Sequence, residues 1–130
     1  MAIFREPVKP PLPVLEDFLQ GLKWHDSGRL LEFLAGNAQM VDVFGKRWNH
    51  EEITKNFVNL FAPYAKKNAT HEIEEIVAES ADHLVVVMLW KNALVASMER
   101  VWMHRMTVVM SRKSDHWAIV FIQMTPVQPT

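Results

Sequence analysis

Two ionisable side chains, Asp42 and His104, stand in segments that are otherwise strongly apolar. Asp42 alternates with Phe44, and a carboxylate held on a strand inside an apolar cavity would have a raised pKa and could take a proton from a carbon acid. His104 alternates with Trp102 and Met106, and a neutral imidazole that faces inward could polarise a carbonyl or accept a proton. Together they predict acid/base chemistry that needs no cofactor.

Each of these residues also has a structural interpretation. Asp42 could stand at the rim of the fold and hydrogen-bond a loop, or pair with Arg100 or Arg105. His104 could be a hydrogen-bonded residue of the core or rim, or could face outward if a bulge shifts the strand register by one residue. The sequence leaves both interpretations open.

Aromatic residues form the second group of candidates, with five tryptophans in 130 residues. Flat side chains could line a cavity for an aromatic or polycyclic ligand and offer indole N–H donors, although core packing is the alternative. An amide at the end of the last strand would add a hydrogen-bonding group. The residues predicted to line the cavity are Phe18, Trp48, Phe57, Trp102, Trp117, Phe121 and Gln123.

A long hairpin from Arg100 to Thr125 must position most of these side chains. Its arms are rich in β-branched and bulky apolar residues, and a polar turn between Ser111 and His116 joins them. Period-two spacing predicts that His104 in the first arm shares its face with Trp117, Phe121 and Gln123 in the second arm.

Hydrophobic periodicity, prolines and caps predict the remaining elements. Prolines before Val14 should forbid a helix, and Asn49 with Glu52 forms a capping box. The expected elements are helices over Val14–Leu22, Leu30–Leu34 and from Asn49 to Pro63, and strands over Gln39–Phe44, Lys46–Trp48, Thr70–Glu79 and Leu84–Lys91. This order predicts an α+β domain over residues 14–127, preceded by a proline-containing arm over residues 1–13.

Composition excludes several classes of function. A net charge of −1 offers no long-range field for nucleic acid or an anionic membrane, and the absence of cysteine excludes thiol chemistry. His25-Asp26 and His71-Glu72 are isolated, so a metal site has little support. The N-terminal segment has prolines and charges where a signal peptide needs an apolar run, so we expect a cytoplasmic protein.

The layout resembles the NTF2-like superfamily, in particular its small SnoaL-like and ketosteroid isomerase-like members. The resemblance rests on Leu31-Glu32-Phe33-Leu34, Ala38 to Gly45, Glu51-Glu52-Ile53 and Trp117 to Thr125. It implies a cone in which a curved antiparallel sheet wraps around N-terminal helices and encloses a deep cavity, and it implies a dimer through the outer face of the sheet. Asp42-Val43-Phe44-Gly45 is similar to the Asp-Pro-Val-Gly of ketosteroid isomerases, whose Asp is the general base.

The sequence departs from the isomerase pattern at three places. Phe18 stands where the resemblance implies a Tyr, no acid lies between Met103 and Thr107, and Gln123 replaces a His of the final strand. Loss of one donor of an oxyanion hole costs about two to three orders of magnitude in rate. The sequence therefore argues against a steroid isomerase proper.

Two functions follow from this resemblance. The first is a SnoaL-like protein that binds a small hydrophobic, ring-containing molecule in its cone, as an isomerase, cyclase or dehydratase with Asp42 and His104 as acid/base residues. The alternative is a non-catalytic ligand-binding or dimerisation module, which a cavity filled by Trp and Met side chains would favour. Either version should form a homodimer through the outer sheet face, with Val101, Met103, Val109 and alternate residues of Leu84 to Lys91.

Overall fold

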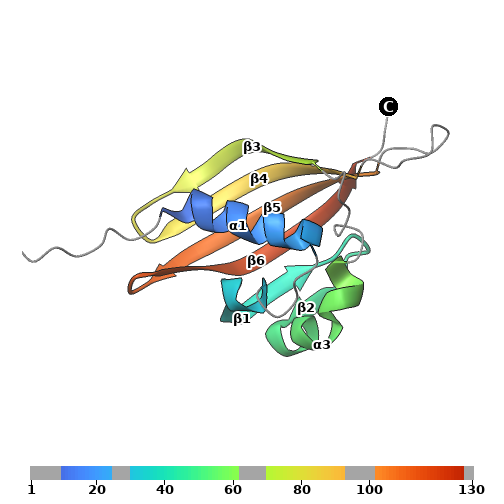
Figure 1. The fold of residues 1–130 in the computed structure, drawn as a ribbon, viewed down its shortest axis with the longest axis horizontal. Coiled ribbons are helices and arrows are strands. Elements are labelled where there is room, and N and C mark those ends of the chain that lie inside the picture. The colour runs from blue at the N-terminus through green and yellow to red at the C-terminus, as the bar shows by residue number, and fades with distance from the viewer. Residues whose placement is uncertain (1–9, 25–29, 62–69, 93–101, 128–130) are drawn as a thin grey trace, which may run out of the picture.

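A helix lies across one face of a six-stranded sheet (Figure 1). The computed structural model describes residues 10–24, 30–61, 70–92 and 102–127. Its elements are α1 (Pro11–Trp24), η1 (Leu31–Phe33), β1 (Leu34–Val41), β2 (Arg47–Asn49), α3 (His50–Phe61), β3 (Thr70–Glu79), β4 (His83–Asn92), β5 (Trp102–Lys113) and β6 (His116–Val127).

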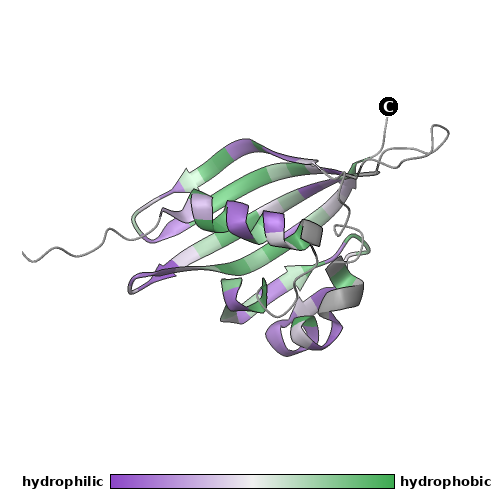
Figure 2. Ribbon diagram, viewed as in Figure 1, coloured by the Kyte–Doolittle hydropathy of each residue, from purple (hydrophilic) through white to green (hydrophobic). Residues whose placement is uncertain are grey.

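The strand order is β2-β1-β6-β5-β4-β3. Strands β3 to β6 form the predicted antiparallel meander, and β1 pairs with β6 in parallel. β3 is an edge strand with two register shifts against β4, and such bulges discourage pairing with another chain. Figure 2 shows β4 as hydrophobic along most of its length, and alternate residues from Leu84 to Trp90 are completely buried.

The core lies between α1 and the inner face of the sheet. Leu15, Phe18, Leu19 and Leu22 follow at helical spacing and are completely buried. The sheet contributes fully buried residues from four strands: Met40 in β1, Leu84, Val86, Met88 and Trp90 in β4, Met106, Val108 and Met110 in β5, and Ile119 in β6. Each large apolar side chain buried in this way contributes about 1.5–3 kcal/mol. The middle of the cone is therefore filled by side chains.

The N-terminal elements differ from the prediction. α1 begins at Pro11, so the expectation that prolines delay it to Val14 was wrong. Proline lacks an N–H group, but the N–H groups of the first helical turn make no hydrogen bond within the helix, so proline is tolerated there. In the helix predicted over Leu30–Leu34, Leu30 is α-helical and Leu31–Phe33 form the 3-10 turn η1, whereas β1 already starts at Leu34. β1 therefore contains Gly36, two residues beyond the predicted end of this helix.

The capping box that starts α3 is confirmed. The amide of Glu52 donates to Asn49 Oδ1 over 2.9 Å, and the amide of Asn49 donates to Glu52 Oε1 over 3.1 Å. Across the described residues, no helix combines the length and the apolar character required to span a membrane.

Candidate functional site

Asp42 holds the turn between β1 and β2. The prediction that Asp42 lies on a strand was wrong, because β1 ends at Val41. Its Oδ1 accepts hydrogen bonds from the amides of Phe44 and Lys46 at 2.9 and 3.0 Å, and its Oδ2 accepts the indole N–H of Trp48 at 2.9 Å. These bonds match the alternative in which Asp42 binds a loop.

The environment of Asp42 is also unlike the predicted apolar cavity. Partial burial raises the pKa of its carboxyl, but the hydrogen bonds from Trp48, Lys46 and Phe44 and the charge of Lys46 outweigh burial and lower the pKa. Phe44 is 92% exposed, so it does not enclose the carboxylate. The expected rise in pKa was wrong because backbone and indole donors stabilise the ionised form.

His104 faces the core, as predicted. It is 4% exposed, and its partner in β4 is the completely buried Trp90. Burial lowers the pKa of its imidazole, so the side chain is neutral near pH 7. Of the two predicted acid/base residues, His104 alone lies in the inner wall.

A bulge in β6 turns Phe121 and Gln123 to the outer face. Val109 of β5 pairs with Phe121 and Met110 pairs with Ile119, so Val120 is an extra residue without a partner in β5. Gln123 is therefore exposed and Phe121 half-buried on the outer face. The prediction that both share the face of His104 was wrong, because one extra residue reverses the alternation.

The other predicted lining residues whose side chains the structure describes do not come together around a single cavity. Phe18 belongs to the core and packs on Phe33, with ring centroids 5.9 Å apart. The indole of Trp48 donates a hydrogen bond to Asp42, and Trp117 packs against the core near the β5–β6 turn. The predicted residues Phe57 and Trp102 have side chains outside the described part of the chain.

The structure reveals a carboxylate–imidazole pair that the sequence did not predict. Nε2 of His71 in β3 lies 2.8 Å from Oε2 of Glu16 in α1. The His71 ring also stacks on Trp90, with centroids 5.5 Å apart and 13° between the planes. Within the described residues, Nδ1 of His71 is buried and has no hydrogen-bond partner. Because Nε2 is held by Glu16 and Nδ1 has no partner among the described residues, this imidazole is arranged like a general base.

The pair belongs to a row of side chains across three strands. His71 is opposite Trp90 in the β3–β4 register, and Trp90 is opposite His104 in the β4–β5 register. Two imidazoles therefore flank one buried indole near one end of their strands. We call Glu16, His71, Trp90 and His104 the histidine row. Among the described residues, no three His, Cys, Asp or Glu side chains are grouped to hold a metal ion.

Comparison with known proteins identifies the architecture. The sequence matches no protein-family profile and no curated protein. Among solved structures, a ketosteroid isomerase-like protein from Erwinia carotovora atroseptica is 13% identical, with a TM-score of 0.75 over 97% of this chain and 100% of that chain. An NTF-2 like protein of unknown function from Shewanella oneidensis is 15% identical, with a TM-score of 0.69 over 88% and 94% of the two chains. The chain has the NTF2-like fold.

Other proteins with the NTF2-like fold carry different names. A candidate association domain of calcium/calmodulin-dependent protein kinase type II from Thiobacillus denitrificans is 16% identical, with a TM-score of 0.78 over 95% of this chain and 100% of that chain. At such low identity the likeness shows the fold alone. One fold hosts many functions, so the choice among them rests on the side chains of this chain.

Proposed function

We propose that this NTF2-like protein binds a small hydrophobic molecule against the histidine row and transfers a proton on it, as an isomerase, cyclase or dehydratase. The observation that carries the proposal is the His71 imidazole, which Glu16 and Trp90 hold in place while its buried Nδ1 has no hydrogen-bond partner within the described residues. A buried polar atom without a hydrogen-bond partner destabilises the folded protein, so its presence points to a functional role.

The hydrogen bond between His71 and Glu16 determines which ring nitrogen of His71 carries the hydrogen. A carboxylate only accepts hydrogen bonds, so in the neutral imidazole Nε2 of His71 carries the hydrogen and Nδ1 carries the lone pair. Nδ1 can therefore accept a proton from a carbon acid, and the nearby carboxylate stabilises the imidazolium that results. His104, neutral because burial lowers its pKa, supplies a second imidazole on the far side of Trp90.

The packing of the core restricts where a ligand could sit. Phe18, Met88 and Met106 are completely buried and fill the middle of the cone. The histidine row lies towards one end of the strands, and Glu16 is 42% exposed there. A ligand against the row would thus be reached from this end. Asp42 is left out of the proposal, because both of its oxygens already accept hydrogen bonds in the turn.

The first experiment combines native mass spectrometry with a proton-exchange assay. A small hydrophobic molecule released on denaturation of the purified protein would define the ligand class. In deuterium oxide, the protein should accelerate exchange of the α-protons of 2-tetralone, a cyclic ketone probe, measured by NMR. The His71→Asn variant should lose about 100-fold of this acceleration, and Glu16→Gln about tenfold.

The matched control is His83→Asn, the same substitution at an exposed His of the same sheet. It should leave the exchange rate unchanged. No released molecule together with equal exchange rates in wild type and His71→Asn would contradict the proposal.

A second candidate function is a non-catalytic dimerisation module. The filled middle of the cone favours it, because Phe18, Met88 and Met106 occupy that space. The outer sheet face carries half-buried apolar side chains from four neighbouring positions of β4 and β5 and one of β6: Val85, Val87, Leu89, Val109 and Phe121. Two solved structures with this fold are named as association domains. A stable dimer without ligand or exchange activity would support this candidate.

A further inference from the structure

A hollow of about 700 Å³ opens beside β1, on the sheet face opposite the core. It exists because β1 and β6 part between two registered pairs: Leu34 is opposite Ile119, and Gln39 is opposite Phe121. Over this interval residues 35–38 of β1 face only Val120 of β6. The irregular pairing therefore leaves a gap in the sheet that the side chains do not close.

Half of the residues that line the hollow are small or apolar. Leu34, Ala118 and Val120 line it, together with Gly36. A Cβ atom built on Gly36 would meet no heavy atom within 4 Å, so the absence of a side chain there keeps the space open. The hollow can accept a few carbon atoms without any rearrangement of the sheet.

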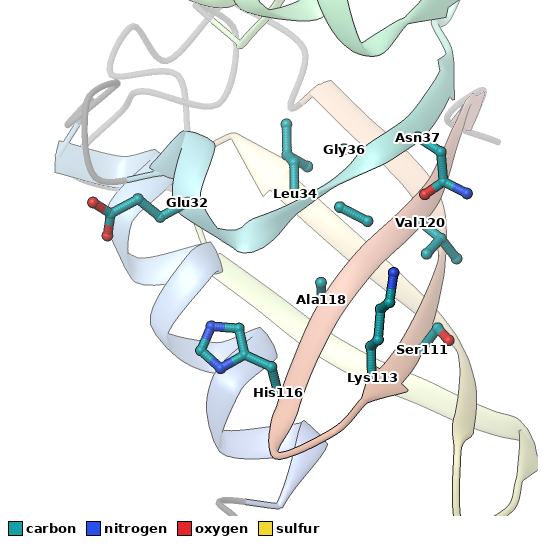
Figure 3. A pocket seen from close by; sticks show the side chains of 10 residues that line it. Glu32, Leu34, Gly36, Asn37, Ser111, Lys113, His116, Ala118 and Val120 are labelled. Atoms are coloured by element: carbon teal, nitrogen blue, oxygen red, sulfur yellow. The ribbon is translucent and has the colours of Figure 1, made fainter.

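One cation and several hydrogen-bonding groups stand around these walls. Figure 3 shows the Lys113 side chain extended into the hollow towards Val120, with Asn37 and Ser111 on the same side. The Glu32 carboxylate, in contrast, points away from the Lys113 ammonium group. No ion pair within the described residues engages Lys113. The ammonium group is thus available to an anion.

We propose that this hollow binds a small organic anion, with its carboxylate at Lys113 and its short apolar tail over Ala118 and Val120. Asn37 and Ser111 supply further hydrogen-bond donors for the carboxylate. Ser111 pairs with Ala118, whereas the neighbouring pair of Met110 and Ile119 is buried in the core. The site therefore lies on the opposite face of the sheet from the histidine row and does not depend on the proposed function.

The test is an NMR titration of the full chain with hexanoate, 1-hexanol and inorganic phosphate as probes. Hexanoate should bind with a dissociation constant on the order of 1 mM, as expected for so few atoms. Hexanol lacks the charge and phosphate lacks the tail, so each should bind at least about tenfold more weakly. The largest shifts should fall on residues that line the hollow.

Three variants separate this site from nonspecific binding. Gly36→Leu should abolish hexanoate binding by filling the hollow, and Lys113→Gln should weaken it about tenfold. Lys91→Gln removes the same charge at the other end of the sheet and should leave the affinity unchanged. An unchanged melting temperature of Gly36→Leu would show that the fold is intact, as the open space at Gly36 predicts.

Several results would overturn the proposal. They are the absence of saturable hexanoate shifts, equal affinity in wild type and Gly36→Leu, phosphate or hexanol binding as tightly as hexanoate, or the same loss in Lys91→Gln as in Lys113→Gln.

Discussion

The imidazole of His71 lies parallel to the indole of Trp90, with the two planes 13° apart, and the same imidazole reaches Glu16 of α1 at 2.8 Å. The ring is therefore held from two elements at once, one strand and one helix. His71 and Glu16 are 55 residues apart in the sequence, so only the packing of α1 on the sheet brings them together. Because of this contact, the candidate base is His71 on the inner wall of the sheet and no longer Asp42 in the β1–β2 turn.

The Asp42 carboxylate should stabilise the folded protein. Asp42→Ala leaves the donors of Phe44, Lys46 and Trp48 without their acceptor and should cost about 1–2 kcal/mol in the free energy of unfolding at neutral pH. Urea denaturation measures this loss. Asp115→Ala in the exposed β5–β6 turn is the control, and an equal cost in both variants would refute the role of the turn.

The contribution of Asp42 should also depend on pH. Its folded pKa lies below the ordinary value of 3.8, so the stabilisation is complete above that value and is lost as the pH falls through the folded pKa. The difference in stability between wild type and Asp42→Ala should therefore shrink between about pH 7 and about pH 2. A difference that stays constant over this range would count against the ionised carboxylate.

Folding disfavours the charged form of His104, whereas it favours the charged form of Asp42. Burial lowers the pKa of His104 below the ordinary value of 6.5, so the unfolded chain binds a proton before the folded protein does. Stability should then fall as the pH decreases below 6.5. His104→Leu should lose less melting temperature between about pH 8 and about pH 5 than wild type does. If exposed His116→Leu removes the same pH dependence, His104 is not the group responsible.

Two glycines should respond differently to alanine. A Cβ on Gly21 would overlap with Cδ2 of the fully buried Leu30 and lie 3.3 Å from its Cγ. Overpacking costs about 1–3 kcal/mol, which exceeds the gain in helix propensity of about 1 kcal/mol, so Gly21→Ala should lower stability. Gly36→Ala meets open space and should be neutral or slightly stabilising. Equal melting temperatures of the two variants would contradict this account.

The outer sheet face should carry a homodimer. Val87 and Val109 lie half-buried on this face, while the described helices lie elsewhere, with α1 on the inner face and α3 against β1 and β2 (Figure 1). A stable dimer buries about 800 Å² on each partner, and a charge at its centre is poorly tolerated. Val87→Lys and Val109→Lys should therefore sediment as monomers at micromolar concentration. Asp115→Lys in the exposed turn is the control, and a monomeric wild type would disprove the prediction.

Local signals in the sequence determined a large part of the fold. The capping box at Asn49 and Glu52 and the alternation within β3, β4 and β5 depend on neighbouring residues and backbone geometry. For this reason the meander and the inward direction of His104 were predicted correctly, and α3 was placed within a few residues of its bounds. The resemblance to NTF2-like proteins rested on this order of elements.

The tertiary structure decided the chemistry. The bulge at Val120 reverses the faces of Phe121 and Gln123. It arises from the pairing of β6 with β5, and no local pattern in the β6 sequence predicts it. Asp42 became a turn residue because β1 ends at Val41, three residues before the predicted end, and three donors converge on its carboxylate. The contact of Glu16 with His71 joins two segments without a shared local pattern. The sequence alone determined which side chains were available, and long-range packing determined which of them meet.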